Sequence, residues 1–180
     1  SYKKMGPKAE VVSTSPILVA QPERPAGPLF APPRVIDADG FESAAVSTAD
    51  IDGDGRQDLF VSGTGASRVY LASADGVARA ADHPLDGVVA GSALWGDVDD
   101  DDLIDVVLCS QTGAVLWRQT ERNVWAPADA RWDKPCASGG MFDSDHDGDL
   151  DWFVTGPAGS ELMSNNRDGT WRALAGEIGL

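Results

Sequence analysis

The 180-residue chain has few of the residue types that catalysis and nucleic-acid binding require. It has two histidines and two cysteines, and its 14 basic residues face 29 acidic ones, which gives a formal net charge of −15. A field of this sign repels phosphate backbones, so nucleic acid is excluded as a partner. His83 precedes a proline and His146 lies in an acidic segment, and neither has an evident nucleophile beside it. Because HExxH, nucleophile-elbow and phosphate-cradling glycine motifs are also missing, the sequence predicts a protein that is not an enzyme.

Long apolar runs are missing as well. No stretch approaches the roughly 18 residues of a membrane span, and the first residues do not form the apolar core of a signal peptide. We therefore expect a protein that is not membrane-spanning, with any export signal absent or already removed. The two cysteines, Cys109 and Cys136, are too few to define a disulfide framework. They could face each other, but the sequence favours two buried, unbonded side chains that act as small apolar residues.

What the sequence does have is a nine-residue acidic cassette that occurs three times. The copies span residues 50–58, 97–105 and 143–151, so the first Asp of successive copies lies 47 and then 46 residues further on. Each copy places Asp at its positions 1, 3, 5 and 9 and then continues into apolar residues. A period this regular indicates a repeat protein.

Carboxylates crowded in this way repel one another, so a folded chain must either splay them into water or gather them around a cation. Hard oxygen donors at every second residue of a tight loop suit Ca²⁺, which takes about six to eight oxygen ligands. Positions 1, 3, 5 and 9 would supply side-chain oxygens, and position 7 a backbone carbonyl. Position 6 needs a positive φ, which Gly55 and Gly148 adopt readily and Asp102 less easily. We expect about three bound Ca²⁺ ions, with ligands from Asp50, Asp52, Asp54, Arg56 and Asp58, from Asp97, Asp99, Asp101, Leu103 and Asp105, and from Asp143, Asp145, Asp147, Asp149 and Asp151.

The same opening begins an EF-hand loop, which needs Glu at position 12 and a helix on each side. Here position 12 is Val61, Leu108 or Val154. The residues that follow each cassette are β-branched or aromatic and bounded by Gly, Ser and Thr, which predicts a short strand. Each cassette is therefore expected to be the turn of a β-hairpin.

A DxDxDGxxD loop that leads into a strand resembles the loop of the FG-GAP repeat, also called the VCBS or integrin-α-like repeat. The resemblance covers about residues 34–180 and implies one β-propeller blade per repeat, with a calcium loop between its first two strands. It also implies calcium binding by the four regularly spaced Asp residues of each cassette. The second copy departs from the family pattern, because Asp100 and Asp102 occupy positions 4 and 6.

The repeat extends beyond the cassettes. Turn-forming pairs lie seventeen residues after each position-9 Asp, at Asp75-Gly76, Arg122-Asn123 and Asp168-Gly169. Segments of small residues precede each cassette, as expected for the crowded inner strands of a propeller. We therefore predict an all-β fold of three four-stranded antiparallel blades, at about residues 41–84, 88–133 and 135–176.

Residues 1–33 differ from the repeat region. They contain seven of the 11 prolines and carry a net charge of +2. This composition predicts a Pro-rich linker or tether, although the run PILVA could also dock as an edge strand.

These features together predict a calcium-binding, non-catalytic β-propeller module for protein interaction or adhesion. Because such sites are most useful where calcium is abundant, we expect an extracellular or periplasmic (secreted) location. One alternative is a carbohydrate-binding, lectin-like propeller, since all six tryptophans lie in the second and third blades; however, Trp125 and Trp171 occupy equivalent repeat positions, which favours packing between blades. A further alternative is an accessory module of a larger exported enzyme. Three blades are fewer than the roughly four to eight that close a propeller, so we expect either further blades or a homo-oligomer.

Overall fold

The computed structural model describes residues 32–36, 41–63 and 65–179. The chain divides into two units, Ser1–Arg34 and Val35–Leu180, and the strands described below belong to the second. The expected linker at residues 1–33, with its PILVA run, falls almost wholly outside the described residues. Within the described part of the chain, no helix is long and apolar enough to cross a membrane.

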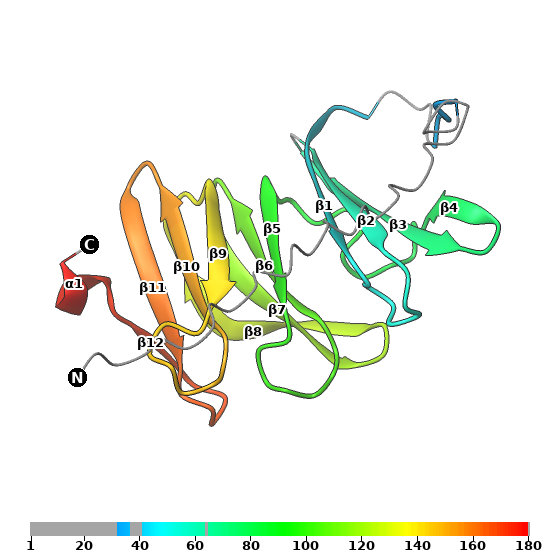
Figure 1. Cartoon of the computed structure of the whole chain (residues 1–180). Helices are drawn as coiled ribbons and strands as arrows, with labels where there is room; N and C mark the ends of the chain where they lie inside the picture. Colours follow the sequence, from blue (N-terminus) through cyan, green and yellow to red (C-terminus); the bar gives the residue numbers. More distant parts are fainter. Residues whose placement is uncertain (1–31, 37–40, 64, 180) are drawn as a thin grey trace, which may run out of the picture. The chain divides into compact units, whose positions relative to one another are not determined.

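Three four-stranded antiparallel sheets make up the described fold, and in each the strands pair in chain order (Figure 1). We call them the first, second and third blade. The first blade contains β1 (Ser43–Ala49), β2 (Asp58–Gly63), β3 (Ser67–Ser73) and β4 (Gly76–Arg79). The second contains β5 (Ser92–Gly96), β6 (Asp105–Ser110), β7 (Gly113–Glu121) and β8 (Val124–Trp132). The third contains β9 (Ser138–Phe142), β10 (Asp151–Gly156), β11 (Gly159–Asn165) and β12 (Trp171–Ala173), and is followed by the four-residue helix α1 (Ala175–Ile178). The predicted all-β class and the three four-stranded antiparallel sheets are confirmed.

Each acidic cassette forms the loop between the first two strands of a blade. The position-9 Asp pairs across the hairpin with the residue that precedes position 1, as Ala49↔Asp58, Gly96↔Asp105 and Phe142↔Asp151. The apolar residues after each cassette form β2, β6 and β10, which are largely buried. The loops are thus hairpin turns between strands, as the sequence predicted, because the residues that follow them prefer a pleated, buried surface.

The second predicted hairpin of each blade is also present. Its turn residues adopt positive φ, at Gly76 (124°), Asn123 (62°) and Gly169 (85°). Glycine and asparagine populate this region at little cost, and this preference made the turns visible in the sequence.

The core lies in two clusters, one between the first and second blades and one between the second and third. In the first cluster, the ring of Phe60 lies edge-on to Trp95 at 5.8 Å, and Trp95 lies edge-on to Trp125 at 6.2 Å. In the second cluster, Trp152 is fully buried and its ring lies 6.2 Å from that of Trp171. Phe60 belongs to the first blade and Trp95 to the second, so their contact joins two blades. Each cluster as a whole contains buried residues from two neighbouring blades, which therefore stabilise each other by packing.

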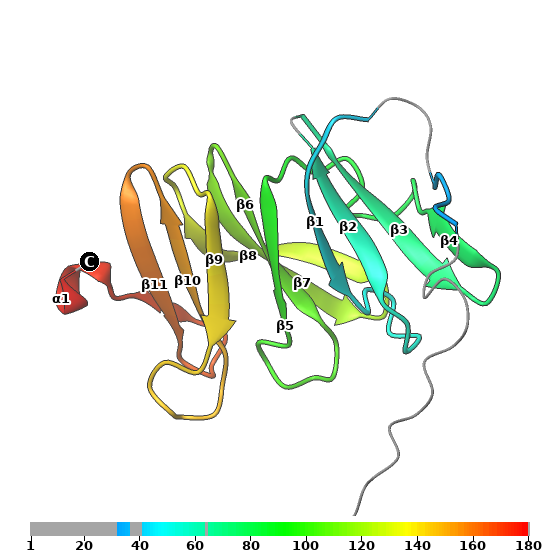
Figure 2. The same ribbon diagram turned by 45° about the horizontal axis from the view of Figure 1, so that its top comes forward.

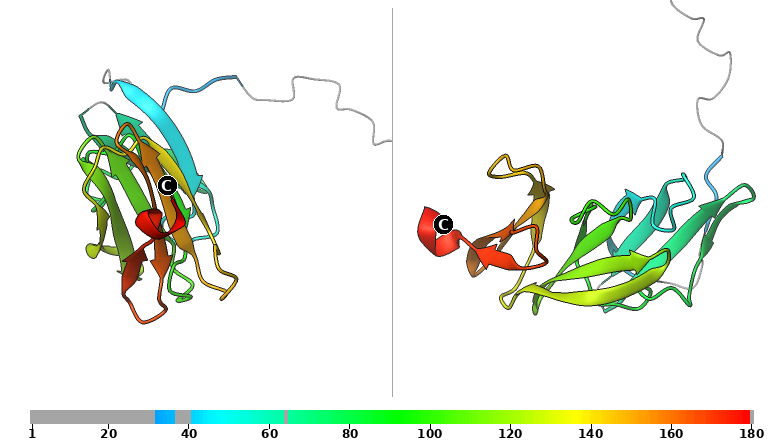
Figure 3. Two further views of the ribbon diagram at one scale, coloured as in Figure 1. Left: turned by 90° about the vertical axis from the view of Figure 1, so that its left-hand side faces the viewer. Right: turned by 90° about the horizontal axis from the view of Figure 1, so that it is seen from below.

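The first strands of the blades, β1, β5 and β9, lie beside one another at the blade boundaries (Figure 2). The indole N–H of Trp95 donates to the hydroxyl of Ser47 at 2.9 Å, and the hydroxyl of Ser92 donates to the carbonyl of Ala137 at 3.1 Å. The small residues of these strands allow this approach. The first and third blades lie on either side of the second, so the described residues do not close a ring (Figure 3).

Cys109 and Cys136 form a disulfide, with their Cα atoms 5.0 Å apart. The sequence-based interpretation of two unbonded cysteines was therefore wrong, although both are buried as expected. The bond joins β6 to the segment before β9, where the N–H of Cys136 donates to the carbonyl of Ser110 at 2.9 Å. This proximity depends on how the third blade packs against the second, a contact between blades that residue spacing does not reveal.

Candidate metal centres

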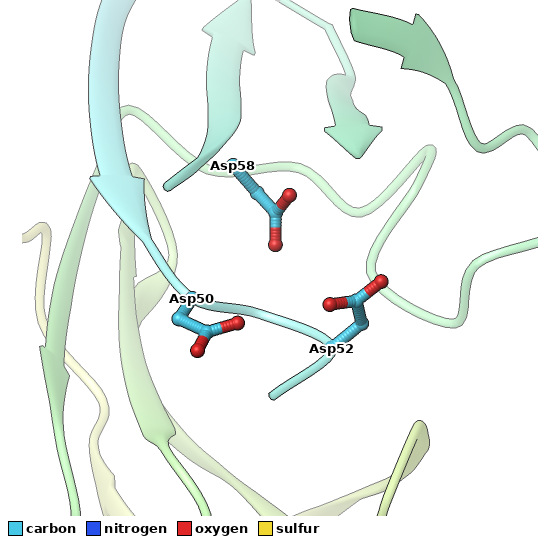
Figure 4. A group of neighbouring side chains, drawn as sticks. All are labelled: Asp50, Asp52 and Asp58. Atoms are coloured by element: carbon cyan, nitrogen blue, oxygen red, sulfur yellow. The ribbon is translucent and has the colours of Figure 1, made fainter. Parts of the chain in front are cut away.

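Three carboxylates converge in each cassette. One oxygen from each of Asp50, Asp52 and Asp58 lies within 4.8 Å of the others (Figure 4). Equivalent groups form at Asp97, Asp99 and Asp101, and at Asp143, Asp145 and Asp147. Positions 1 and 3 are common to all three groups, whereas the third member is position 9 in the first loop and position 5 in the other two.

The structure leaves some of the predicted ligands outside these groups. Asp54, at position 5 of the first loop, forms an ion pair with Arg56. Asp105 and Asp151, at position 9 of the other loops, are fully buried and hydrogen-bonded to backbone groups. The backbone carbonyls expected at position 7 remain a prediction.

The position-1 carboxylate accepts backbone hydrogen bonds from its own loop. The N–H of position 6 donates to it in all three copies, from Gly55 to Asp50 (2.8 Å), from Asp102 to Asp97 (3.0 Å) and from Gly148 to Asp143 (3.2 Å). Carboxylates that accept backbone N–H groups are held in a fixed orientation. The loop therefore curls around its first Asp by its own hydrogen bonds.

This curl places two residues of each loop in the left-handed region. Position 6 has φ of 87° at Gly55, 65° at Asp102 and 97° at Gly148, as the sequence predicted. Position 4 also has positive φ, at Gly53 (69°), Asp100 (56°) and His146 (65°), a requirement that we did not predict. Gly53 was the only sequence signal for it, because glycine is the residue for which this conformation costs least.

The position-9 Asp is fully buried in every copy. One of its oxygens accepts the N–H of position 2, as Ile51 to Asp58 (2.8 Å), Val98 to Asp105 (3.1 Å) and Ser144 to Asp151 (2.9 Å). The other oxygen accepts an N–H from the third strand of the same blade, as Ala72 to Asp58 (2.7 Å), Gln119 to Asp105 (2.9 Å) and Asn165 to Asp151 (2.9 Å). This carboxylate thus joins the start of its loop to the third strand, a structural role that the sequence did not reveal.

Two of these third-strand residues also reach the preceding blade. The amide nitrogen of Gln119 donates to the carbonyls of Ile51 (3.4 Å) and Ile104 (3.2 Å). The amide nitrogen of Asn165 makes the equivalent bonds, to Val98 (2.7 Å) and Leu150 (3.4 Å). Each amide therefore connects position 2 of the preceding loop to the residue before position 9 of its own blade. The first blade has Ala72 at this position and makes no such bond.

Crowding and burial oppose the ionised form of several carboxyl groups. Desolvation, followed by the charges of Asp58 and Asp54, raises the pKa of Asp52. Burial raises the pKa of Asp105 to about 6, although two backbone N–H groups that donate to it act in the opposite direction. Burial and the neighbouring carboxyl of Asp147 raise the pKa of Asp149 to about 6 as well. A nearby divalent cation would favour the ionised forms and offset this repulsion.

The donor set of the three groups fits a hard cation. Every potential ligand atom in them is a carboxylate oxygen, and no sulfur or imidazole belongs to them. Such sites suit Ca²⁺ or Mg²⁺ rather than Zn²⁺ or copper. Of these ions, Ca²⁺ tolerates the irregular and unequal ligand sets of the three loops best.

Four-stranded blades joined in series, each with an acidic loop between its first two strands, define a β-propeller-like repeat module. A family model for the FG-GAP repeat matches residues 44–71, which cover most of β1, the first loop, β2 and most of β3. Residues 44–71 are thus an FG-GAP repeat, which confirms the resemblance inferred from the cassettes. Outside the matched segment, the second and third blades keep the same strand order and the same position-9 hydrogen bonds. Comparisons with curated proteins and with solved structures give no match.

Proposed function

We propose that this chain is a calcium-binding, non-catalytic β-propeller module that serves protein interaction or adhesion. The observation that carries the proposal is the recurrence of one carboxylate arrangement in three structurally equivalent loops, each with three oxygens within 4.8 Å of one another. Chance acidity on a surface would not repeat the same strand register, the same positive φ positions and the same backbone hydrogen bonds.

Within this proposal the aspartates have two tasks. Those at positions 1 and 3 hold the cation in every loop, together with Asp58 in the first loop and with the position-5 residues Asp101 and Asp147 in the other two. The position-9 carboxylates keep the loop attached to the third strand through their two backbone hydrogen bonds. A bound Ca²⁺ supplies positive charge that offsets the repulsion among the carboxylates, and a loop held in this way fixes the register of the two strands that it connects.

The disulfide supports the proposed extracellular or periplasmic location. Structural disulfides persist in oxidising compartments and are rare in reducing ones. The bond between Cys109 and Cys136 fastens the second blade to the third, as the hydrogen bond from Asn165 to Val98 also does. Calcium is also abundant outside cells, which agrees with sites built from a few carboxylates per loop.

The packing of the tryptophans gives little support to the carbohydrate-binding alternative. Trp125, Trp132 and Trp152 are buried, and Trp95, Trp117 and Trp171 are half-buried. Sugar stacking requires an open indole face, whereas these rings mostly pack in the two core clusters. We therefore favour interaction with a protein over interaction with a glycan.

Isothermal titration of the calcium-free chain with CaCl₂ tests the proposal. We expect about three binding events, and we expect Asp52→Asn, Asp99→Asn and Asp145→Asn each to remove one of them. Asp133→Asn, an exposed carboxylate outside the loops, is the matched control and should bind like the wild type. Absence of calcium binding, or a stoichiometry that none of the three loop variants lowers, would overturn the proposal.

The interaction role is tested separately with the calcium-loaded chain on arrays of extracellular proteins and of glycans. We expect calcium-dependent binding to proteins. Binding to glycans alone, abolished by substitution of Trp117 or Trp171, would replace this role with the carbohydrate-binding alternative.

A further inference from the structure

One carboxylate of the second acidic loop is already paired with a cation of the protein. Asp99, at position 3, forms an ion pair with Arg118 of β7. Asp99 also belongs to the group that it makes with Asp97 and Asp101, in which one oxygen from each lies within 4.8 Å of the others. The same carboxylate is therefore both a candidate metal ligand and the partner of a guanidinium.

The ion pairs near the other loops are of a different kind. In the first loop, Arg56 pairs with Asp54, which lies outside the converging group. Arg167 approaches the second loop too, but its partner Asp100 is 3.9 Å away and outside the group, and both side chains are more than half exposed. Among the ion pairs of the described residues, the pair of Asp99 and Arg118 is thus the one in which a protein cation holds a potential metal ligand.

This pair lies in a partly desolvated place. Asp99 and Arg118 both line a cavity of about 680 Å³ between the second and third blades, and their side chains are 31% and 29% exposed. The Nε of Arg118 is buried and has no hydrogen-bond partner within the described part of the chain. A guanidinium that is partly removed from water depends on its counter-ion, so withdrawing Asp99 from Arg118 costs free energy.

The blade does not need an arginine at this place. The equivalent residue, thirteen positions after the position-9 Asp, is Leu71 in the first blade and Ser164 in the third. All three residues lie in the third strand of their blades, which keep the same strand order. Because neutral residues suffice in two blades, the positive charge of Arg118 points to a role in the second loop.

We propose that Arg118 is an internal counter-ion that competes with calcium at the second loop. The inference rests on the proposed calcium-binding function and concerns how strongly one of the three loops binds. Without calcium, the guanidinium neutralises Asp99 and reduces the repulsion within its group. A Ca²⁺ ion bound by Asp99 must share that carboxylate with Arg118 or displace it, and the two cations repel each other. The second loop therefore fills at a higher calcium concentration than it would with a neutral residue at position 118.

Calcium titration of the whole chain, followed by NMR, tests the proposal. The backbone N–H signals at position 6, from Gly55, Asp102 and Gly148, report the three loops separately. Arg118→Leu and Arg118→Ser copy the residues of the first and third blades. Each should raise the calcium affinity of the second loop about three- to tenfold and leave the other two loops unchanged.

Two control variants separate the charge from the side chain that carries it. Arg118→Lys keeps the positive charge and should bind calcium with nearly the affinity of the wild type. Arg131→Leu removes an arginine that lines the same cavity but pairs with Asp129, outside the acidic loops. It should leave the affinity of the second loop unchanged, and a gain as large as that of Arg118→Leu would overturn the proposal.

Salt and chelation provide readouts that a purely structural role of Arg118 would not affect. The difference in affinity between the wild type and Arg118→Leu should shrink as NaCl is raised, because mobile ions screen a partly exposed charge. In EDTA, Arg118→Leu should lower the hydrogen-exchange protection of the second loop, and excess calcium should restore it. Unchanged or weaker calcium binding at the second loop in both the Leu and Ser variants, with the other loops still binding, would overturn this inference alone. Absence of calcium binding in all three loops would overturn the proposed function as well.

Discussion

The side-chain amide of Asn165 donates a hydrogen bond to the backbone carbonyl of Val98, with the two atoms 2.7 Å apart. The N–H of Val98 in turn donates to the carboxylate of Asp105, and the N–H of Asn165 donates to that of Asp151. Gln119 makes the equivalent connection between the first and second loops. The three acidic loops are therefore linked by one continuous series of hydrogen bonds that crosses both blade boundaries.

Asn165→Ala should destabilise the chain by about 1 to 3 kcal/mol, because it leaves the buried carbonyl of Val98 and the part-buried carbonyl of Leu150 without this donor. Asn166→Ala is the matched control. Its amide bonds to Thr170 on the exposed side of the same turn, so its removal should change stability by less than about 0.5 kcal/mol. Urea unfolding of both variants in excess calcium measures the difference. Equal stabilities would show that the amide does not hold the two blades together.

Asp102→Gly should stabilise the second blade by about 1 kcal/mol, because residue 102 has φ of 65° and the other loops have glycine at this position. The backbone N–H that donates to Asp97 is kept. Asp102→Asn is the control for charge, since it removes the same carboxylate and still carries a side chain. Denaturant unfolding in saturating calcium separates the relief of backbone strain from the removal of the charge. A Gly variant no more stable than the Asn variant would show that the backbone at residue 102 is not strained.

Replacing both Cys109 and Cys136 with alanine should cost about 3 to 4 kcal/mol in the chain-entropy account of a cross-link that closes a 27-residue separation. The measurement is the denaturant midpoint with and without a reductant. Reductant should lower the midpoint of the wild type and leave that of the double variant unchanged. If the reductant left the denaturant midpoint of the wild type unchanged although alkylation showed that both cysteines had been reduced, the disulfide would not be stabilising.

His83 should make stability depend on pH between the aspartate range and neutrality. Burial lowers its pKa below the ordinary 6.5, against the smaller effects of Asp86 and Asp58, and Leu85 donates its N–H to Nδ1. As the pH falls below about 6.5, the unfolded chain takes up the proton first, so the folded state loses stability. At neutral pH and above, both states are neutral and this loss is absent.

His83→Asn isolates that contribution, because an asparagine oxygen can accept the same N–H and does not titrate. Melting temperatures of wild type and variant would be compared at pH 7.5 and pH 5.5 in excess calcium. The melting temperature of the wild type should fall further between pH 7.5 and pH 5.5 than that of the variant. Parallel losses would assign the pH dependence to the carboxylates alone.

The parts of this fold that could be predicted from the sequence are those encoded locally. A cassette with Asp at alternate positions, glycine where φ is positive and β-branched residues afterwards specifies a hairpin within about a dozen residues. The roles that went unpredicted depend on residues far apart in the chain. The Asp105 carboxylate binds the N–H of Gln119, and Asn165 reaches back 67 residues to Val98. Contacts between blades follow from how the sheets pack, and no short spacing encodes them.

The cysteines show the same limit. Their separation of 27 residues is compatible with many geometries, and only the packing of the third blade on the second brings them together. The left-handed conformation at position 4 was hidden for a different reason. Asp100 and His146 tolerate it less readily than glycine, so two of the three copies carried no sequence signal for it.

The central claim, that the three acidic loops bind calcium and thereby hold the blades in register, is tested most directly by thermal unfolding. The same chain would be melted in excess CaCl₂ and in EDTA at matched ionic strength, with MgCl₂ as the control for divalent charge. Calcium at about 100 times the dissociation constant contributes roughly 2.7 kcal/mol per site. The account therefore predicts one cooperative unfolding transition, with a clearly higher melting temperature in calcium than in EDTA or magnesium. An identical midpoint in calcium and EDTA would contradict it.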